Sequence, residues 1–234
     1  MSGPTPEFDR YAEEYKELTN DPIRERFAPG SEFFHRRKWD LLANFMRRAG
    51  LHPENSAWLD VGCGQGELLR MGAGYFGEVA GCDLSTGMLA ACAGLKVTPQ
   101  TEPTRLPFPN QTFDVITSVC VYHHVEVKAR PALTAEISRV LRPGGTACII
   151  EHNPFNPVTQ LIVSRLPIDA DAHLLTAGTS RRLLKNAGLA SCETAYFLYF
   201  PESVYRRAHK IESWLRRVPA GGQYAVFARK NVSQ

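Results

Sequence analysis

The chain has 234 residues, which suits one sizeable domain or one domain with an appended cap. With 44% hydrophobic and 22% charged residues it has the composition of an ordinary globular protein, and no apolar run approaches the roughly 20 residues of a membrane-spanning helix. The formal net charge of +3 is too small to indicate nucleic-acid binding by itself.

The N-terminal part of the chain predicts two helices, at 7–18 and 31–49. In the second, Phe34, Leu41, Leu42 and Phe45 recur at roughly helical spacing, and Ser31 can cap its start. The first residues are polar and acidic and do not resemble a secretory signal. The six cysteines occur singly, which favours buried free thiols over disulfides or zinc. We therefore expect a cytoplasmic protein.

From residue 57 onward, short apolar runs alternate with helical patterns. This alternation predicts an α/β fold, with a mostly parallel, doubly wound sheet covered on both faces. We expect a single domain made of N-terminal helices (1–50), a cofactor-binding half (51–151), a lid interrupted by prolines (152–178) and a C-terminal half (179–234). Strands are expected at 57–61, 77–82, 95–98, 113–120, 146–151, 190–199 and 223–229, and helices at 66–73, 85–93, 127–141, 179–187 and 202–218.

The stretch "LDVGCGQG" places Gly62, Gly64 and Gly66 directly after the first strand. Glycines at the end of a strand let a ligand touch the backbone, and Asp83, which ends the next strand, can accept both hydroxyls of a ribose. The spacing is not the G-x-G-x-x-G of dinucleotide-binding proteins, no G-K-[ST] follows, and the loop holds no Lys or Arg. These features point to a nucleoside ligand without phosphates.

Together these motifs resemble those of the class I S-adenosylmethionine-dependent methyltransferases over nearly the whole chain. The segments "GCDLSTGML", "TEPTRLPFPNQTFDVITS", "VCVYHHV" and "EISRVLRPGG" are similar to the segments that follow the glycine loop in that family. The resemblance implies S-adenosylmethionine as the cofactor and seven strands in the order 3-2-1-4-5-7-6, the seventh antiparallel. It also implies that Glu102, in place of the more usual Asp, accepts from the adenine amino group, and that Lys38 answers the cofactor's carboxylate. The cofactor-binding residues implied are Tyr11, Tyr15, Lys38, Asp60, Gly62, Cys63, Gly64, Gly66, Asp83, Leu84, Met88, Glu102, Pro103 and Cys120.

Methyl transfer to a hydroxyl requires a positioned nucleophile and a group that removes its proton. His123 and His124 follow the fourth strand, and Glu151 ends the fifth, its neighbour in the family's sheet. We expect one of these histidines, His124 ahead of His123, to act as base with Glu151 orienting the ring. In the alternative, the histidines cap a helix or pack on the cofactor. A metal site of His123, His124 and His152 lacks a recognisable spacing, so no metal is expected.

The lid and the segment before it supply the candidate substrate contacts. His152, Asn153, Asn156 and His173, together with Asp169 and Asp171, could meet a polyhydroxylated substrate, or they could simply be solvated. The layout also resembles methyltransferases of bacterial sugar and polysaccharide biosynthesis. We therefore expect O-methylation of a small polar metabolite, a sugar or a glycosylated intermediate. The alternatives are an RNA methyltransferase and a protein that binds S-adenosylmethionine without catalysis.

A charge asymmetry marks the C-terminal part of the chain. Residues 181–230 hold ten Lys or Arg and three Glu, a local balance of +7. In the helix expected at 202–218, the basic residues fall largely outside the apolar face. They predict either a solvated helix face or an anionic partner, such as a nucleotide-sugar, a lipid-phosphate carrier or a membrane surface. Because the basic residues follow a helix face rather than alternating with stacking aromatics, nucleic acid is not the partner expected.

Overall fold

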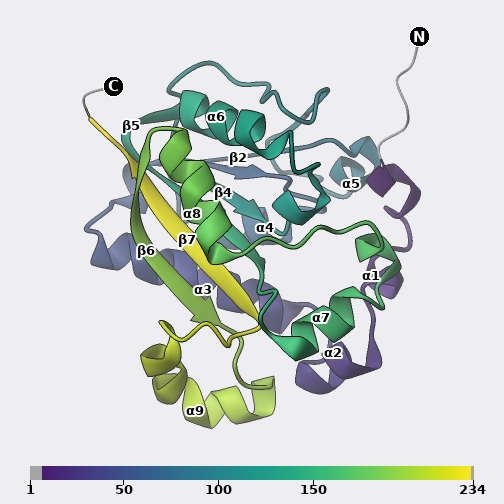
Figure 1. Ribbon diagram of the computed structural model, residues 1–234. Coiled ribbons are helices and arrows are strands. Elements are labelled where there is room, and N and C mark those ends of the chain that lie inside the picture. The colour runs from purple at the N-terminus through teal and green to yellow at the C-terminus, as the bar shows by residue number, and fades with distance from the viewer. Residues whose placement is uncertain (1–6, 233–234) are drawn as a thin grey trace.

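The computed structural model describes residues 7–232, and its centre is a seven-stranded sheet (Figure 1). The strand order is β3-β2-β1-β4-β5-β7-β6, with β7 antiparallel to both of its neighbours and the other pairs parallel. The predicted α/β fold class and strand order are confirmed. The strands are β1 Ala57–Val61, β2 Glu78–Asp83, β3 Val97–Pro99, β4 Phe113–Val119, β5 Leu141–His152, β6 Leu189–Phe197 and β7 Gln223–Lys230.

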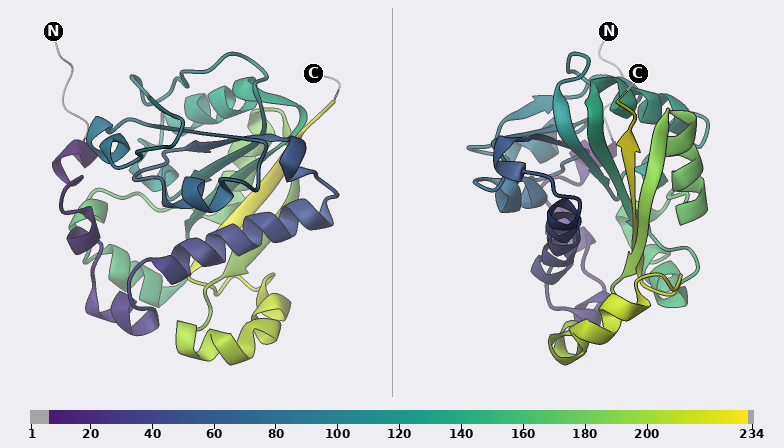
Figure 2. Two further views of the ribbon diagram at one scale, coloured as in Figure 1. Left: turned by 180° about the vertical axis from the view of Figure 1, so that it is seen from behind. Right: turned by 90° about the vertical axis from the view of Figure 1, so that its left-hand side faces the viewer.

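Helices cover both faces of the sheet, as the near-continuous burial of the strands requires (Figure 2). On one face α6 and α8 pack on β5, β6 and β7. On the other, α4 and α5 pack over the β1–β2 side, and α3 extends to β7, where Phe45 stacks on Phe227 at 4.0 Å. The α-helices are α1 Tyr15–Leu18, α2 Pro22–Phe27, α3 Glu32–Arg48, α4 Glu67–Gly72, α5 Thr86–Ala90, α6 Arg130–Val140, α7 Pro157–Val163, α8 Ala177–Asn186 and α9 Glu202–Leu215. Four 3₁₀ turns complete the elements, namely η1 Glu7–Arg10, η2 Pro53–Asn55, η3 Tyr122–His124 and η4 Pro167–Asp169.

The N-terminal region differs from the single helix expected at 7–18. It divides into η1 and α1, because the Asp9 carboxylate accepts hydrogen bonds from Ser85 Oγ at 2.5 Å and Gly87 N at 2.9 Å and so holds η1 against α5. The sequence prediction also missed α2. Asp21 caps this helix by accepting from the amides of Ile23 and Arg24, and Pro22 opens it.

Other boundaries shift for local reasons. The helix expected from residue 127 begins at Arg130, with Pro131 in its first turn, where a missing N–H does no harm. The strand expected at 146–151 begins earlier, at Leu141, and has an irregular register to β4 at its start. The lid contains a helix, α7, whose start Asn156 caps by accepting from Thr159 N at 2.9 Å. None of the helices in the described part of the chain combines the length and apolar character needed to cross a bilayer.

Candidate active site

The glycine loop lies at the carboxyl ends of β1 and β2. The amides of Gly62 and Cys63 donate to the Cys82 carbonyl at 2.8 and 3.0 Å, and the Gly64 amide donates to Asp83 Oδ2 at 2.8 Å. The other oxygen of Asp83 accepts from Ser85 N at 2.9 Å. Each carboxylate oxygen can accept a second hydrogen bond, so Asp83 both fixes the loop and can serve a ribose.

Gly62 shows why this loop gives up its side chains. Its φ of 71° lies in the left-handed region, and an added Cβ would stand 2.3 Å from Cγ2 of Val121. The loop therefore runs against the segment that follows β4, and it lines the same hollow as Asp83 and Cys120. Gly66, with φ 80°, plays a different part: it is the N-cap of α4, outside the lining.

A cavity of about 1020 Å³ opens beside this loop. Its volume is at the upper end of the usual range for small-molecule sites, so a cofactor and an acceptor can share it. Fifteen of the site residues predicted from the sequence lie in its wall, namely Tyr15, Lys38, Asp60, Gly62, Cys63, Gly64, Asp83, Leu84, Met88, Pro103, Cys120, His123, His124, His152 and Asn156.

Besides Gly66 and Glu151, four predicted residues lie outside the lining, and their surroundings explain why. Tyr11 packs edge-on against Phe8, and it is Phe8 that faces the cavity. Buried Asn153 donates from Nδ2 to the carbonyls of Pro219 and Gly221 and so ties the start of the lid to the β7 end. His173 is exposed and bonds to the Asp171 carbonyl at 2.9 Å. These positions do not suit the direct contacts expected of them.

Glu102 is the last of these four residues outside the lining. Its side chain is exposed, whereas the neighbouring Gln100 is buried and faces the cavity. Gln100 Nε2 donates to the Glu102 carbonyl at 2.8 Å, which fixes the amide at the carboxyl end of β3. Gln100, not Glu102, is thus the polar side chain that lines the cavity at the carboxyl end of β3. The signal in the sequence was a polar residue directly after a short strand, whereas the family resemblance implied the acid two residues later.

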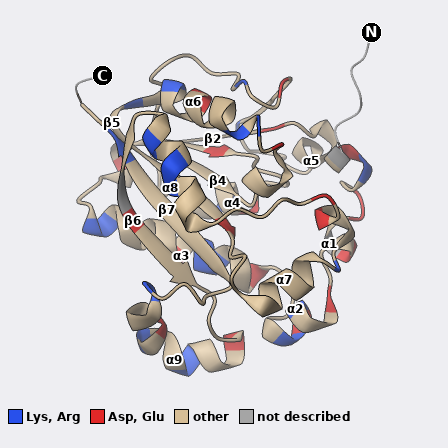
Figure 3. Cartoon of the chain, viewed as in Figure 1, with Lys and Arg blue, Asp and Glu red and all other residues tan. Residues whose placement is uncertain are grey.

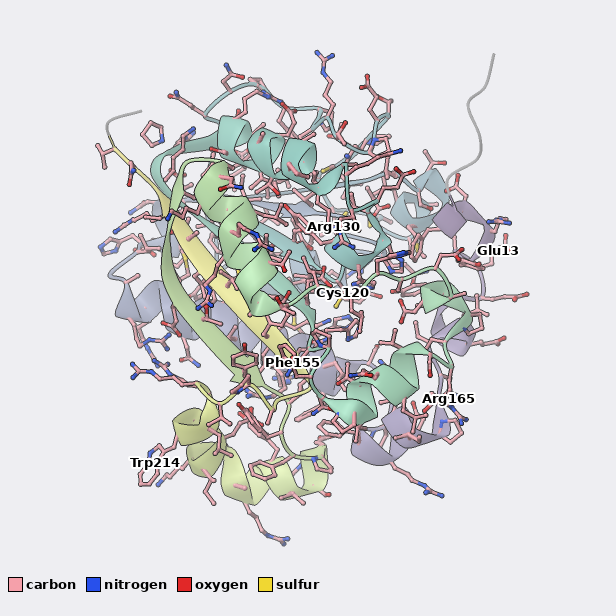
Figure 4. The ribbon with its side chains drawn as sticks, viewed as in Figure 1. Glu13, Cys120, Arg130, Phe155, Arg165 and Trp214 are labelled. Atoms are coloured by element: carbon pink, nitrogen blue, oxygen red, sulfur yellow. The ribbon has the colours of Figure 1, made fainter. Side chains whose placement is uncertain are left out.

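Lys38 and Cys120 meet in the wall of the cavity. Lys38 Nζ lies 3.7 Å from Cys120 Sγ, and Cys120 has a φ of 57° at the point where the chain leaves β4 (Figure 4). Burial raises the pKa of the Cys120 thiol, but the charges of Lys38 and His152 outweigh burial and bring it down to about 7. A residue other than glycine in the left-handed region is strained, and such strain is commonly kept at functional sites.

His123 lies between two buried carboxylates. Its Nδ1 is 2.5 Å from Glu151 Oε2, and its Nε2 is 3.4 Å from Asp169 Oδ1. Burial alone would lower the pKa of His123, but Glu151 and Asp169 raise it to about 10. The ring is therefore an imidazolium at neutral pH. Glu151 also accepts from the amides of Val121 and Tyr122, so it holds η3 as well as the ring.

His124 has the opposite electrostatic surroundings. It faces the cavity, its Nε2 lies 3.4 Å from Asp169 Oδ1, and its ring packs edge-on against Phe8 at 4.8 Å. Burial and the neighbouring charge of His123 lower its pKa to about 4. Glu151 thus contacts His123, whereas the acid beside His124 is Asp169, from η4 in the lid. A lid residue approaching the end of β4 could not be derived from strand adjacency alone.

The same cluster has the donor atoms of a metal site. His123, His124 and Asp169 each offer one ligand atom, and these atoms lie within 4.8 Å of one another. The third histidine considered from the sequence, His152, packs near the cluster with its ring centroid 5.1 Å from that of His123. The imidazolium of His123 already supplies positive charge between the two carboxylates, so the arrangement is electrostatically consistent without an ion.

Two segments distant in sequence roof the cavity. Gln65 Nε2 donates to the Ala12 carbonyl at 2.9 Å, which holds the N-terminal segment over the glycine loop. Arg165, just after α7, makes an ion pair with Asp21 at 2.7 Å and so joins the lid to α2. Figure 4 shows Arg165 beside α2 and Cys120 well inside the molecule. Residues of both segments line the space, including Tyr15 and Ile162.

The half of the cavity away from the glycine loop has a mixed lining. Arg24, His35 and Gln223 supply polar groups, and Gln223 Oε1 is buried with no hydrogen-bond partner among the described residues. Apolar side chains from α2, α3, the lid and the β6–α9 connection supply the rest, namely Phe27, Phe34, Ile162, Leu166 and Leu198. This half therefore suits a molecule with both a polar and an apolar part.

The fold, the glycine loop and the acid that ends β2 define the class of protein, the class I S-adenosylmethionine-dependent methyltransferase fold. A family profile described as "Methyltransferase domain" matches residues 59–149. This match confirms the resemblance of the sequence to the class I methyltransferases, and S-adenosylmethionine is the cofactor of that class.

Solved structures agree on the fold. A SAM-dependent methyltransferase from Archaeoglobus fulgidus is 20% identical, covers 82% of this chain and 94% of its own, and superposes with a TM-score of 0.61. An S-adenosylmethionine-dependent methyltransferase from Mesorhizobium loti is 21% identical, with 78% and 95% covered and a TM-score of 0.58.

Curated relatives match over part of their length. A tRNA (carboxymethyluridine(34)-5-O)-methyltransferase of Arabidopsis thaliana is 29% identical over 57% of this chain and 32% of its own length. A demethylmenaquinone methyltransferase of Symbiobacterium thermophilum is 34% identical over 64% of this chain and 59% of its own length. The chain therefore spans about a third to three fifths of these two relatives.

Replacing Asp83 with Ala should weaken the binding of S-adenosylhomocysteine by about 1–3 kcal/mol, the usual result of leaving hydrogen-bonding partners unsatisfied. Isothermal titration calorimetry measures this change. Asp171→Ala removes an exposed carboxylate of the lid and should bind normally. Thermal melts show whether the glycine loop, which Asp83 also holds, survives the change. An Asp83→Ala protein that folds and binds with undiminished affinity would exclude the ribose role.

Proposed function

We propose that the protein transfers the methyl group of S-adenosylmethionine to a hydroxyl of a small molecule, namely a sugar or glycosylated intermediate that also carries an apolar part. The observation that carries this proposal is the position of His124 in the cavity wall, with Nε2 3.4 Å from the buried carboxylate of Asp169. Burial and the neighbouring charge of His123 lower its pKa, which favours the neutral imidazole. A neutral ring can take a proton from a hydroxyl as the methyl group arrives.

The residues around the acceptor have different roles in accepting its proton. When Nε2 of His124 donates to Asp169, the atom left to accept the hydroxyl proton is Nδ1. The His123 imidazolium keeps His124 neutral and holds Asp169 ionised, and Glu151 secures His123. The protein supplies geometry and a proton acceptor, and the bound cofactor supplies the activated methyl group.

The lining supports the choice of acceptor. A fully polar sugar would leave Phe27, Phe34 and Ile162 against hydroxyl groups, whereas a glycosylated molecule with an apolar part satisfies both kinds of wall. The unpartnered Oε1 of Gln223 can accept from an acceptor hydroxyl. Asn156 and His152, expected from the sequence to meet the substrate, lie in the same wall.

Methylation of RNA is the second candidate. It is favoured by the names of several relatives, which are tRNA methyltransferases. The roof formed by the N-terminal segment and the lid favours a small acceptor, since a nucleotide within a polymer would need an open path for its backbone.

Transfer of labelled methyl separates the candidates. The purified protein is incubated with methyl-labelled S-adenosylmethionine and, in parallel, with total tRNA, a polar metabolite extract and a lipid extract. We expect label in the lipid extract, or in the polar one if the apolar part is short, and its loss in His124→Asn. Label in tRNA alone would establish the second candidate. Normal cofactor binding with no transfer to any fraction would indicate a protein that binds without catalysis.

A further inference from the structure

The outer face of α9 is the most unusual surface in the described part of the chain. Trp214 is 87% exposed, Ile211 56%, Val204 46% and Val218, just after the helix, 45%. Soluble proteins seldom leave so many large apolar side chains together on one short helix without a use for them. The helix runs along one end of the molecule, where Figure 4 shows Trp214 projecting away from the body.

The inner face of α9 packs against α3, so the exposed apolar residues do not belong to the face that joins the helix to the core. Tyr205 packs against Phe33 at 5.5 Å and lies under the Arg37 guanidinium at 4.0 Å. Buried Glu212 makes an ion pair with the same arginine. The helix is thus anchored on α3 through its polar and aromatic side, and it turns Val204, Ile211 and Trp214 outward.

The charges on this face are of one sign. Arg207, Lys210 and Arg217 are exposed along the helix and its end. The two acids of the helix are engaged elsewhere, Glu202 with Arg206 at 2.8 Å and Glu212 with Arg37. Figure 3 shows the basic segments of α9 at the lower edge of the molecule. The face therefore combines aliphatic side chains, a tryptophan and uncompensated positive charge.

We propose that this α9 face, made of Val204, Arg207, Lys210, Ile211, Trp214, Arg217 and Val218, docks on a membrane surface rich in anionic phospholipid. A helix that lies in the interface buries its apolar side chains among acyl chains while Lys and Arg reach the phosphates, and Trp prefers the headgroup boundary. An RNA partner would contact the basic residues and Trp214, but it would leave the aliphatic side chains of Val204, Ile211 and Val218 without apolar contacts. A second copy of the face would bring like charges together.

Docking would have a purpose in the reaction, because the α9 face adjoins the wall of the cavity. Leu198, Tyr199 and Pro201, which lead into α9, line the cavity, and Tyr199 OH donates to the Leu215 carbonyl at 2.7 Å at the far end of the helix. At the same end of the molecule, α7 and its approach expose Phe155, Val158 and Leu161, and Val158 lines the cavity as well (Figures 1 and 2). A docked protein would hold the mixed half of its cavity close to the lipid. Only this purpose rests on the proposed function; docking itself does not.

Co-sedimentation with vesicles tests the proposal without any acceptor. The full chain should bind vesicles of phosphatidylcholine with phosphatidylglycerol, bind phosphatidylcholine alone weakly, and lose binding as salt is raised. Arg207→Glu/Lys210→Glu should lower the partition coefficient by at least about fivefold for each basic residue removed. Trp214→Ser/Ile211→Ser should lower it at low and high salt alike.

Matched controls separate the α9 face from net charge. Arg182→Glu/Lys185→Glu makes the same change of charge on the exposed side of α8 and should leave most of the binding intact. S-adenosylhomocysteine titration checks that each variant is folded. Equal binding to neutral and anionic vesicles, an equal loss in the α8 variant, or no loss in either α9 variant would overturn the proposal. The proposal would also be overturned if the protein does not bind vesicles but binds tRNA tightly, or dimerises, in a way that the α9 changes abolish. None of these results depends on whether methyl transfer to a hydroxyl is correct.

Discussion

Replacing His124 with Asn should lower turnover by roughly 10²–10⁴-fold, the usual contribution of a general base, while the affinity for S-adenosylhomocysteine stays unchanged. The ring lies in the wall of the cavity, and Asn keeps a polar side chain of similar reach without a basic nitrogen. Turnover is measured on the acceptor fraction that takes up label. His173→Asn, an exposed histidine bonded to the carbonyl of Asp171, is the matched control and should retain full turnover.

The pH dependence of this reaction adds a second test of the same base. Because the pKa of His124 is lowered to about 4, its ring is already neutral well below physiological pH. The rate should rise as pH increases through about 4 and be flat above about 6. A rate still rising between pH 6 and 7 would mean that the base has an ordinary histidine pKa. If His124→Asn retains turnover within tenfold, positioning alone drives transfer and His124 is a packing residue.

Replacing Glu151 with Gln should lower the free energy of unfolding by about 3–5 kcal/mol, the typical result of removing one partner of a buried ion pair. Gln keeps an oxygen that can accept from the amides of Val121 and Tyr122, so the change isolates the loss of charge beside His123. Urea denaturation at pH 7 measures the difference. Glu126→Gln, at an exposed carboxylate, should unfold with the wild-type midpoint.

The stability difference should shrink as pH rises. His123 has a folded-state pKa of about 10 against an ordinary value of 6.5, so its stabilising charge is fully present below about pH 6.5 and is lost as pH rises through about 10. Wild-type and Glu151→Gln proteins should therefore differ most near pH 6 to 7 and least near pH 10. Parallel curves across this range would show that His123 is neutral in the folded protein.

The cofactor half of the site was accessible from the sequence because local chemistry fixes it. Gly62 must accommodate a positive φ and the approach of Val121, and Asp83 must end β2 within reach of the Gly64 amide. Such demands leave residue types at fixed spacings. The strand order followed from the family resemblance, and the alternation of strands and helices agreed with it.

The acceptor half was less accessible because it depends on contacts between distant segments. Asp169 reaches His124 from the lid, and Asp21 binds Arg165 across 144 positions of sequence. Neither contact leaves a periodic pattern. The family resemblance implied Glu102, whereas Gln100 is the side chain that lines the cavity. The cause is similar, because the direction of the backbone decides which of two residues at the end of a short strand faces the cavity.

The family profile covers only part of the chain that lines the cavity. The shared domain spans residues 59–149, which hold the glycine loop, Asp83 and the two histidines. The mixed wall comes from outside that span, with Arg24 and Phe34 before it and Ile162 and Gln223 after it. The mixed wall therefore lies in segments that the methyltransferase profile does not cover. A different acceptor would call for different flanking segments, while the glycine loop and Asp83 could stay as they are.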